Sequence, residues 1–263
     1  MEGQIAIEHG HRLLASAVGL LTIGLAVVSF GTRFRWAAIL AAGLVVFQGL
    51  LGGITVIYRL PSAVSTAHLA MGTAFFCLLI YLWHGSGGGR SAGGDRRMVG
   101  AAFPAFVVVI LVYAQMLLGA LVRHLGAGLA CNNHPVLCNG MLWPDRGPAQ
   151  LHMWHRVLGV LVAVVILVHA LPIRRRLLAV GARARAHAVL LGPILVTAQI
   201  ILGMLSVSRF LDPLLVTLHL GFAELLIGHQ LLLALELRRG RRTDAPNDEI
   251  PAELSGALEG AYS

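Results

Sequence analysis

The sequence contains no lysine and few charged residues of any kind, since Asp, Glu and Arg make up only 12% of its 263 residues. Charged residues form about a quarter of an ordinary soluble domain, so this composition excludes that class. Hydrophobic residues make up 57% of the chain, and the mean hydropathy is +0.79. The chain is therefore predicted to be a membrane protein with the lipid bilayer as its partner.

Long apolar runs account for most of the chain. A bilayer core about 30 Å thick needs roughly 20 apolar residues per helix. The polar start of the first run has no clean small-residue cleavage site, which favours a retained span over a signal peptide. We predict an all-α fold, a polytopic membrane helix bundle. Its seven transmembrane helices are expected at 6–31, 35–58, 62–84, 98–123, 149–172, 184–208 and 213–237.

The basic residues indicate topology rather than nucleic-acid binding. All 20 are arginines, and they cluster between the apolar runs. By the positive-inside rule, the side with more arginines faces the cytoplasm. We therefore expect a multi-pass plasma-membrane protein with its N-terminus outside and its C-terminus in the cytoplasm. The arginines on the predicted cytoplasmic side are Arg33, Arg35, Arg90, Arg96, Arg97, Arg174, Arg175, Arg176, Arg183, Arg185, Arg238, Arg239, Arg241 and Arg242.

An internal repeat divides the chain. Gln48 and His68 are 20 residues apart, as are Gln199 and His219, and each Gln is followed four residues later by Gly. The segment 98–123, with Gln115 and Gly119, precedes the second copy, and nothing equivalent precedes 6–31. We expect a first helix to be absent, or the start codon to be placed too far downstream.

The repeat predicts two pseudo-symmetric bundles. Residues 1–84 form the three-helix N-terminal bundle, and 98–237 the four-helix C-terminal bundle. The Gly-rich segment 85–97 is expected to be a cytoplasmic linker, and 238–263 a disordered tail.

Four histidines occupy matching positions in the two copies: His11, His68, His155 and His219. Each lies near the outer end of a helix predicted to run inward. Two imidazoles facing each other at one depth are what six-coordinate heme iron requires. A single intramembrane His is more often a packing residue, but a duplicated set favours two duplicated sites. Zinc is disfavoured, since only two histidines converge at each site.

Glu8 stands three residues before His11, so both project from nearly the same helix face. A carboxyl group there can move protons, unless it merely pairs with Arg12. The second copy has His152 at the equivalent position. This asymmetry predicts one reactive heme site and one that only carries electrons. The candidates for clamping heme propionates or orienting ligands are Arg12, Arg123, Arg156 and His152.

The three cysteines are too few for a disulfide scaffold. Cys131 and Cys138 share one polar loop that is expected to face an oxidising compartment, where a disulfide can form. Cys77 lies within an apolar run and is interpreted as a small buried residue. Four further histidines, at the predicted inner ends, are interpreted as solvated or interfacial: His84, His169, His187 and His229.

Taken together, Glu8-x-x-His11-Arg12, His68, His155-Arg156, His219 and the loop from Leu121 to Gly140 resemble the heme A synthase family. The resemblance covers residues 5–237. It implies a membrane enzyme that oxidises the C8 methyl of heme O to a formyl group through hydroxylated intermediates, for use by terminal oxidases. It also implies heme b on His155 and His219, substrate heme on His11 and His68, a catalytic Glu8 and a Cys131–Cys138 disulfide.

The resemblance further implies heme O synthase and an electron donor as partners, and we allow for a homo-oligomer. Family members usually have eight helices and often a further cysteine pair after the first, neither of which this sequence has. The competing interpretation is a bis-histidine diheme cytochrome that transfers electrons without modifying heme. A third is a histidine-lined metal or proton transporter.

Overall fold

The computed structural model describes residues 2–58, 61–88, 100–131, 134, 136–145 and 147–239, with side chains described from Glu8 onward. These ranges contain helices and no strand. Seven helical segments are long and apolar enough to cross a membrane, which confirms the predicted number. The helices are α1 (Glu2–Val28), α2 (Arg35–Ile57), α3 (Ser62–Trp83), α4 (Ala102–His124), α5 (Gly147–Ala179), α6 (Arg183–Val189), α7 (Leu191–Ser208) and α8 (Pro213–Arg239).

One predicted helix end was wrong. The helix expected to end at residue 172 continues through Pro172 to Ala179, because a proline removes only one backbone hydrogen bond and the following Ile173 and Leu177 pack in a buried cluster. The span predicted over 184–208 is confirmed as the candidate span Arg183–Ser208, within which a break at Leu190 separates α6 from α7. Pro193 has no N–H to donate four residues back, which explains the division.

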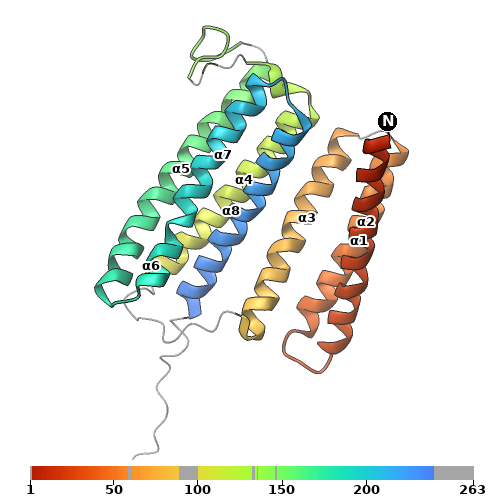
Figure 1. The fold of residues 1–263 in the computed structure, drawn as a ribbon, viewed down its shortest axis with the longest axis vertical. Helices are drawn as coiled ribbons and strands as arrows, with labels where there is room; N and C mark the ends of the chain where they lie inside the picture. The colour runs from red at the N-terminus through yellow and green to blue at the C-terminus, as the bar shows by residue number, and fades with distance from the viewer. Residues whose placement is uncertain are drawn as a thin grey trace, which may run out of the picture.

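Four helices form a closed ring in the C-terminal half. Helix α4 packs against α5 and α8, and α7 packs against the same two helices (Figure 1). A buried cluster fills the ring, with Val112 from α4, Ile166 from α5 and Ile227 from α8 at its centre. Helix α8 is the most buried of the candidate spans.

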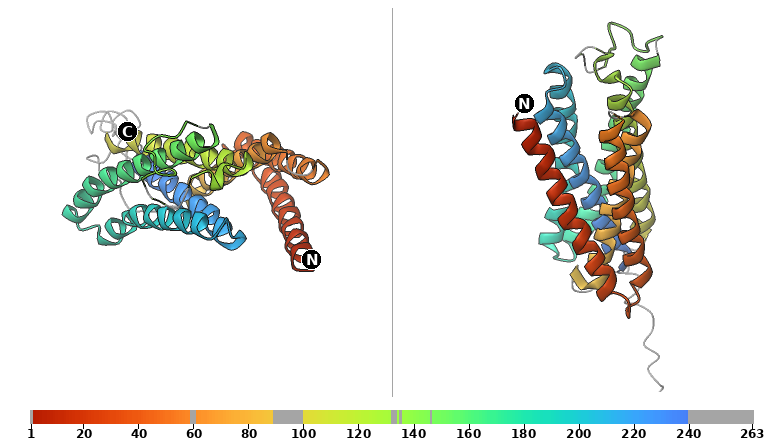
Figure 2. Two further views of the ribbon diagram at one scale, coloured as in Figure 1. Left: turned by 90° about the horizontal axis from the view of Figure 1, so that it is seen from above. Right: turned by 90° about the vertical axis from the view of Figure 1, so that its right-hand side faces the viewer.

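The N-terminal half is an open row. Helix α2 packs between α1 and α3, and α3 joins the two halves through α4 and α8. Helix α1 leans away from the rest of the molecule (Figure 2), and it is the most exposed candidate span. In the C-terminal ring, α4 contacts both α5 and α8. Among the described residues, no helix on the side away from α2 contacts both α1 and α3 in the same way.

Large apolar side chains cover the outside of the bundle, among them Leu21 at 75% and Phe103 at 78% exposure. Such surfaces suit a protein whose outer residues meet lipid. His84–Gly88 form a short helical turn after α3, interrupted at Gly87. The rest of the predicted linker, and the predicted tail from residue 240, lie outside the described residues.

Candidate functional site

A glutamine and a glycine of α4 form the pocket for His155 on α5. Gln115 Nε2 donates a hydrogen bond of 2.9 Å to the His155 backbone carbonyl. Gly119 lies one turn later, where a Cβ atom would stand 2.8 Å from His155 Cε1. A real Cβ essentially never comes that close, so glycine is what allows the ring to lie against α4.

The same pocket recurs at two other helix pairs. Gln48 Nε2 of α2 donates a 2.7 Å hydrogen bond to the His68 carbonyl on α3, and a Cβ at Gly52 would lie 3.4 Å from His68 Cε1. Between α7 and α8, a Cβ at Gly203 would lie 3.2 Å from His219 Cε1. Three of the four predicted heme ligands therefore occupy equivalent pockets.

The three pockets contain matching unsatisfied atoms. Within the described part of the chain, Nδ1 of His68, His155 and His219 is buried without a hydrogen-bond partner. Each ring nevertheless faces the backbone carbonyl of its own pocket's glutamine. A metal-bound imidazole commonly donates its second N–H to a backbone carbonyl. A small reorientation of each ring would let its Nδ1–H donate to this backbone carbonyl and would leave Nε2 free to bind a metal.

The members of each predicted histidine pair lie near each other. His155 is near enough to His219 for their charges to interact, and His68 is near enough to His11. The first pair is partly buried between helices of the closed ring, whereas His11 is exposed on α1. Among the described residues, no glutamine–glycine pocket covers His11.

Glu8 pairs with Arg12 one helical turn away, with Glu8 Oε1 3.7 Å from Arg12 Nη1. Their side chains are 55% and 70% exposed. This is the pairing weighed above as the alternative to a proton-transfer role. An exposed pair of this kind contributes at most about 1 kcal/mol, so it leaves the carboxylate available for other partners.

The other orienting candidates have different environments. His152 is 4% exposed and lies near His155, and its Nδ1 has no partner among the described residues. Arg123 is exposed in the last turn of α4. Of these two, only His152 is buried beside a predicted iron ligand.

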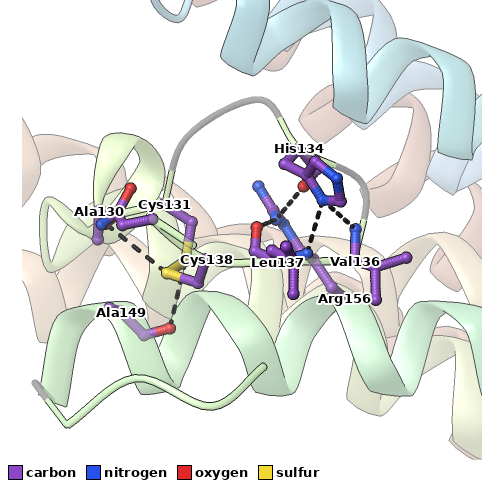
Figure 3. Close-up of a disulfide and its surroundings, with 9 residues drawn as sticks. Ala130, Cys131, His134, Val136, Leu137, Cys138, Ala149 and Arg156 are labelled. Carbon is purple, nitrogen blue, oxygen red and sulfur yellow. Dashed lines mark hydrogen bonds between the residues drawn. A yellow bond between two sulfur atoms is a disulfide. The ribbon is translucent and has the colours of Figure 1, made fainter. Parts of the chain in front are cut away.

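The loop between α4 and α5 carries the Cys131–Cys138 disulfide, which confirms the predicted pairing. Asn139 and Gly140 follow with φ of 53° and 88°, the left-handed conformations that suit these two residue types in a tight hairpin turn. Arg156 Nη1 donates a 2.8 Å hydrogen bond to the His134 carbonyl (Figure 3). Arg156 therefore fastens this loop to the helix that carries His155.

Sequence reasoning missed two carboxylates of α8. Glu224 accepts a 2.6 Å hydrogen bond from the Thr73 hydroxyl of α3. Glu236 Oε1 lies 3.3 Å from Nε2 of His84, and His84 is 7% exposed. The interpretation of His84 as solvated was wrong, because contacts with α8, a helix far away in sequence, bury its side chain. An acid inside an apolar span was the available signal for Glu224.

Comparisons with known proteins agree with this geometry. Residues 2–228 match the family described as cytochrome oxidase assembly protein. The heme A synthase of Symbiobacterium thermophilum is 32% identical over 228 residues, which are 82% of this chain and 73% of that protein. The heme A synthase of Geobacillus kaustophilus is 26% identical over 253 residues, 90% of this chain and 77% of that protein.

A third relative matches a shorter part. The heme A synthase of Alkalihalophilus pseudofirmus is 32% identical over 174 residues, 62% of this chain. That match spans 57% of the relative's own length. The shared segment is thus little more than half of that protein.

Proposed function

Because the chain belongs to the cytochrome oxidase assembly protein family, we propose that it is a heme A synthase of the membrane, an oxidoreductase in heme A biosynthesis. Its substrate is heme O, whose C8 methyl group it oxidises to a formyl group. The observation that carries the proposal is the pocket repeated around His68, His155 and His219, where a glycine admits each ring.

The C-terminal half fits a resident heme b. His155 and His219 lie close together, both partly buried, and each has an unsatisfied Nδ1 facing a glutamine carbonyl. These two residues would hold the iron, which when bound supplies one-electron chemistry. The closed ring of α4, α5, α7 and α8 would exclude water, and buried His152 would orient His155.

The N-terminal half suits the substrate. His11 and His68 would hold heme O. Glu8 lies on the same face of α1 as His11 and would take up and release protons beside the reacting methyl group. Arg12 and Arg123, both exposed, and Arg156 would bind propionates, although Arg156 also bonds the disulfide loop.

The arginine distribution supports the proposed orientation. The N-terminus and the disulfide loop would lie outside the plasma membrane, where an oxidising environment maintains Cys131–Cys138. The C-terminus would lie in the cytoplasm. Heme O synthase would supply the substrate, and a one-electron donor would supply electrons. Association of several copies in the bilayer stays a prediction.

The test is heme A production. The chain is expressed in a host that makes heme O but no heme A, and extracted hemes are separated by reverse-phase chromatography. The wild type is expected to yield heme A, and the His68→Ala variant none. The His187→Ala variant is the matched control, since His187 is exposed on α6 away from the repeated pockets, and should behave as wild type.

Two results would reject the proposal. Two permanently bound hemes b without heme A would favour the diheme cytochrome. No Soret absorption at all would favour a histidine-lined transporter. Loss of heme A in the His68 variant alone, with heme b retained, would assign substrate binding to the N-terminal half.

A further inference from the structure

One hydrogen bond joins equivalent positions of the two halves. Thr73 of α3 follows His68 by five residues, and Glu224 of α8 follows His219 by five. The Thr73 hydroxyl donates to Glu224 Oε1 at 2.6 Å. Five residues advance a helix by about 7.5 Å and turn it by about 140°. The bond therefore lies deeper than both histidines and between the two candidate heme sites.

Glu224 lies near the middle of its span. It follows the start of α8, Pro213, by 11 residues, about 16 Å along the helix, against a hydrocarbon core about 30 Å thick. Thr73 is 2% exposed, and Glu224 Oε2 is buried without a partner among the described residues. Charge at this depth is costly, and ionisable residues there mark function by default.

The groups that face Glu224 are a hydroxyl, a thiol and a phenol. On α3 these are Thr73 and, one turn further, Cys77, which lies within electrostatic range of Glu224. On α4 it is Tyr113, also within that range, whose hydroxyl donates to the Ala70 carbonyl at 2.9 Å. Helix α7 contains no titratable residue. Within the described chain, no arginine or histidine therefore pairs with Glu224.

The other acid of α8 shows the contrast. Glu236 Oε1 has an imidazole nitrogen beside it, Nε2 of His84, 3.3 Å away. Between the two acids, Phe76 and Ile80 of α3 close over Gly228, where an added Cβ would lie 3.1 and 3.2 Å from them. Apolar side chains thus separate Glu224 from the end of α8 that carries Glu236.

We propose that Glu224 is a proton-holding residue shared by the two heme sites: its carboxylate takes up one proton when one electron enters the heme pair. This rests on the proposed function. A ferric heme with two neutral imidazoles carries one net positive charge on its iron–porphyrin core, and reduction removes that charge. The electron comes from a one-electron donor, the proton comes from water, and the neutral carboxylic acid returns the proton on reoxidation.

The test is a potentiometric titration of the heme-loaded protein in lipid nanodiscs at a series of pH values. Dithionite and ferricyanide serve as reductant and oxidant. In the wild type, the midpoint potential should fall with rising pH, with a limit of about 59 mV per tenfold change in proton concentration for one proton per electron. The Glu224→Gln variant should lose most of this slope. The matched Glu236→Gln variant should keep it.

A second measurement identifies the group. The infrared difference spectrum between reduced and oxidised protein should contain a protonated-carboxyl band that is absent in Glu224→Gln. That band should shift in Thr73→Val, which keeps the carboxyl but removes its hydrogen bond. This variant also provides the test if Glu224→Gln fails to fold.

The inference and the proposed function fail differently. The inference is overturned, even if heme A is made, by either of two results. One is an unchanged slope of midpoint potential against pH in Glu224→Gln, and the other is a carboxyl band that does not shift in Thr73→Val. A protein that binds no heme overturns the proposed function instead, and the inference with it.

Discussion

Replacing Gly119 with alanine tests the repeated pocket most directly. The new Cβ would lie 2.8 Å from His155 Cε1, whereas the equivalent distances are 3.2 Å at Gly203 and 3.4 Å at Gly52. Only the first lies under the 3.0 Å limit of real Cβ contacts, so the His155 ring must move. Overpacking of this kind costs about 1–3 kcal/mol, which corresponds to roughly a 5- to 150-fold weaker heme affinity.

The assay is a Soret titration of apo-protein in nanodiscs with hemin, together with the electron paramagnetic resonance signal of bis-imidazole iron. We expect affinity at the C-terminal site to fall more in Gly119→Ala than in Gly203→Ala, and to stay unchanged in Gly52→Ala, because Gly52 lies against His68 in the other half. Gly221→Ala is the control, because nothing lies within 4 Å of its Cβ position on α8. If Gly119→Ala bound hemin as tightly as Gly221→Ala, with the same resonance signal, the pocket described here would be refuted.

Three further predictions concern the rest of the molecule. Replacing Glu8 with alanine should abolish heme A in extracted hemes while leaving heme b in place, since the exposed pair with Arg12 adds little stability; undiminished heme A would remove Glu8 from the chemistry. Alkylation of the unfolded protein should label Cys77 alone before reduction and all three cysteines after it, as read by intact mass. Because the disulfide closes a short loop, its removal should lower the free energy of unfolding by about 2 kcal/mol, measured as a lower thermal midpoint. Alkaline phosphatase fused after Arg239 should be inactive and a fluorescent protein at the same site bright; the opposite pattern would reverse the proposed orientation.

The sequence predicted the number of spans and the disulfide, because these depend on composition and on two cysteines that share one short loop. The histidine pairings follow from a repeat visible along the chain and stay a prediction. The sequence did not predict which helix faces which. The partnership of His84 with Glu236, and of Thr73 with Glu224, joins α3 to α8 across about 150 residues, and no local pattern encodes that contact. The extension of α5 past Pro172 was missed for a related reason, since packing of Ile173 and Leu177 outweighs the lost hydrogen bond.

The open row of α1, α2 and α3 has a thermodynamic consequence. Helix α1 packs mainly on α2. The separation of His11 from His68 is therefore set indirectly, through α2, whereas His155 and His219 lie on helices of a closed ring. Under the proposed function, heme binding to His11 and His68 would use part of its binding free energy to order α1, which would weaken heme retention in that half. Weak retention would suit a substrate site, which must release its product, and the closed ring would suit a site that keeps its cofactor. One duplicated framework would then provide two residence times.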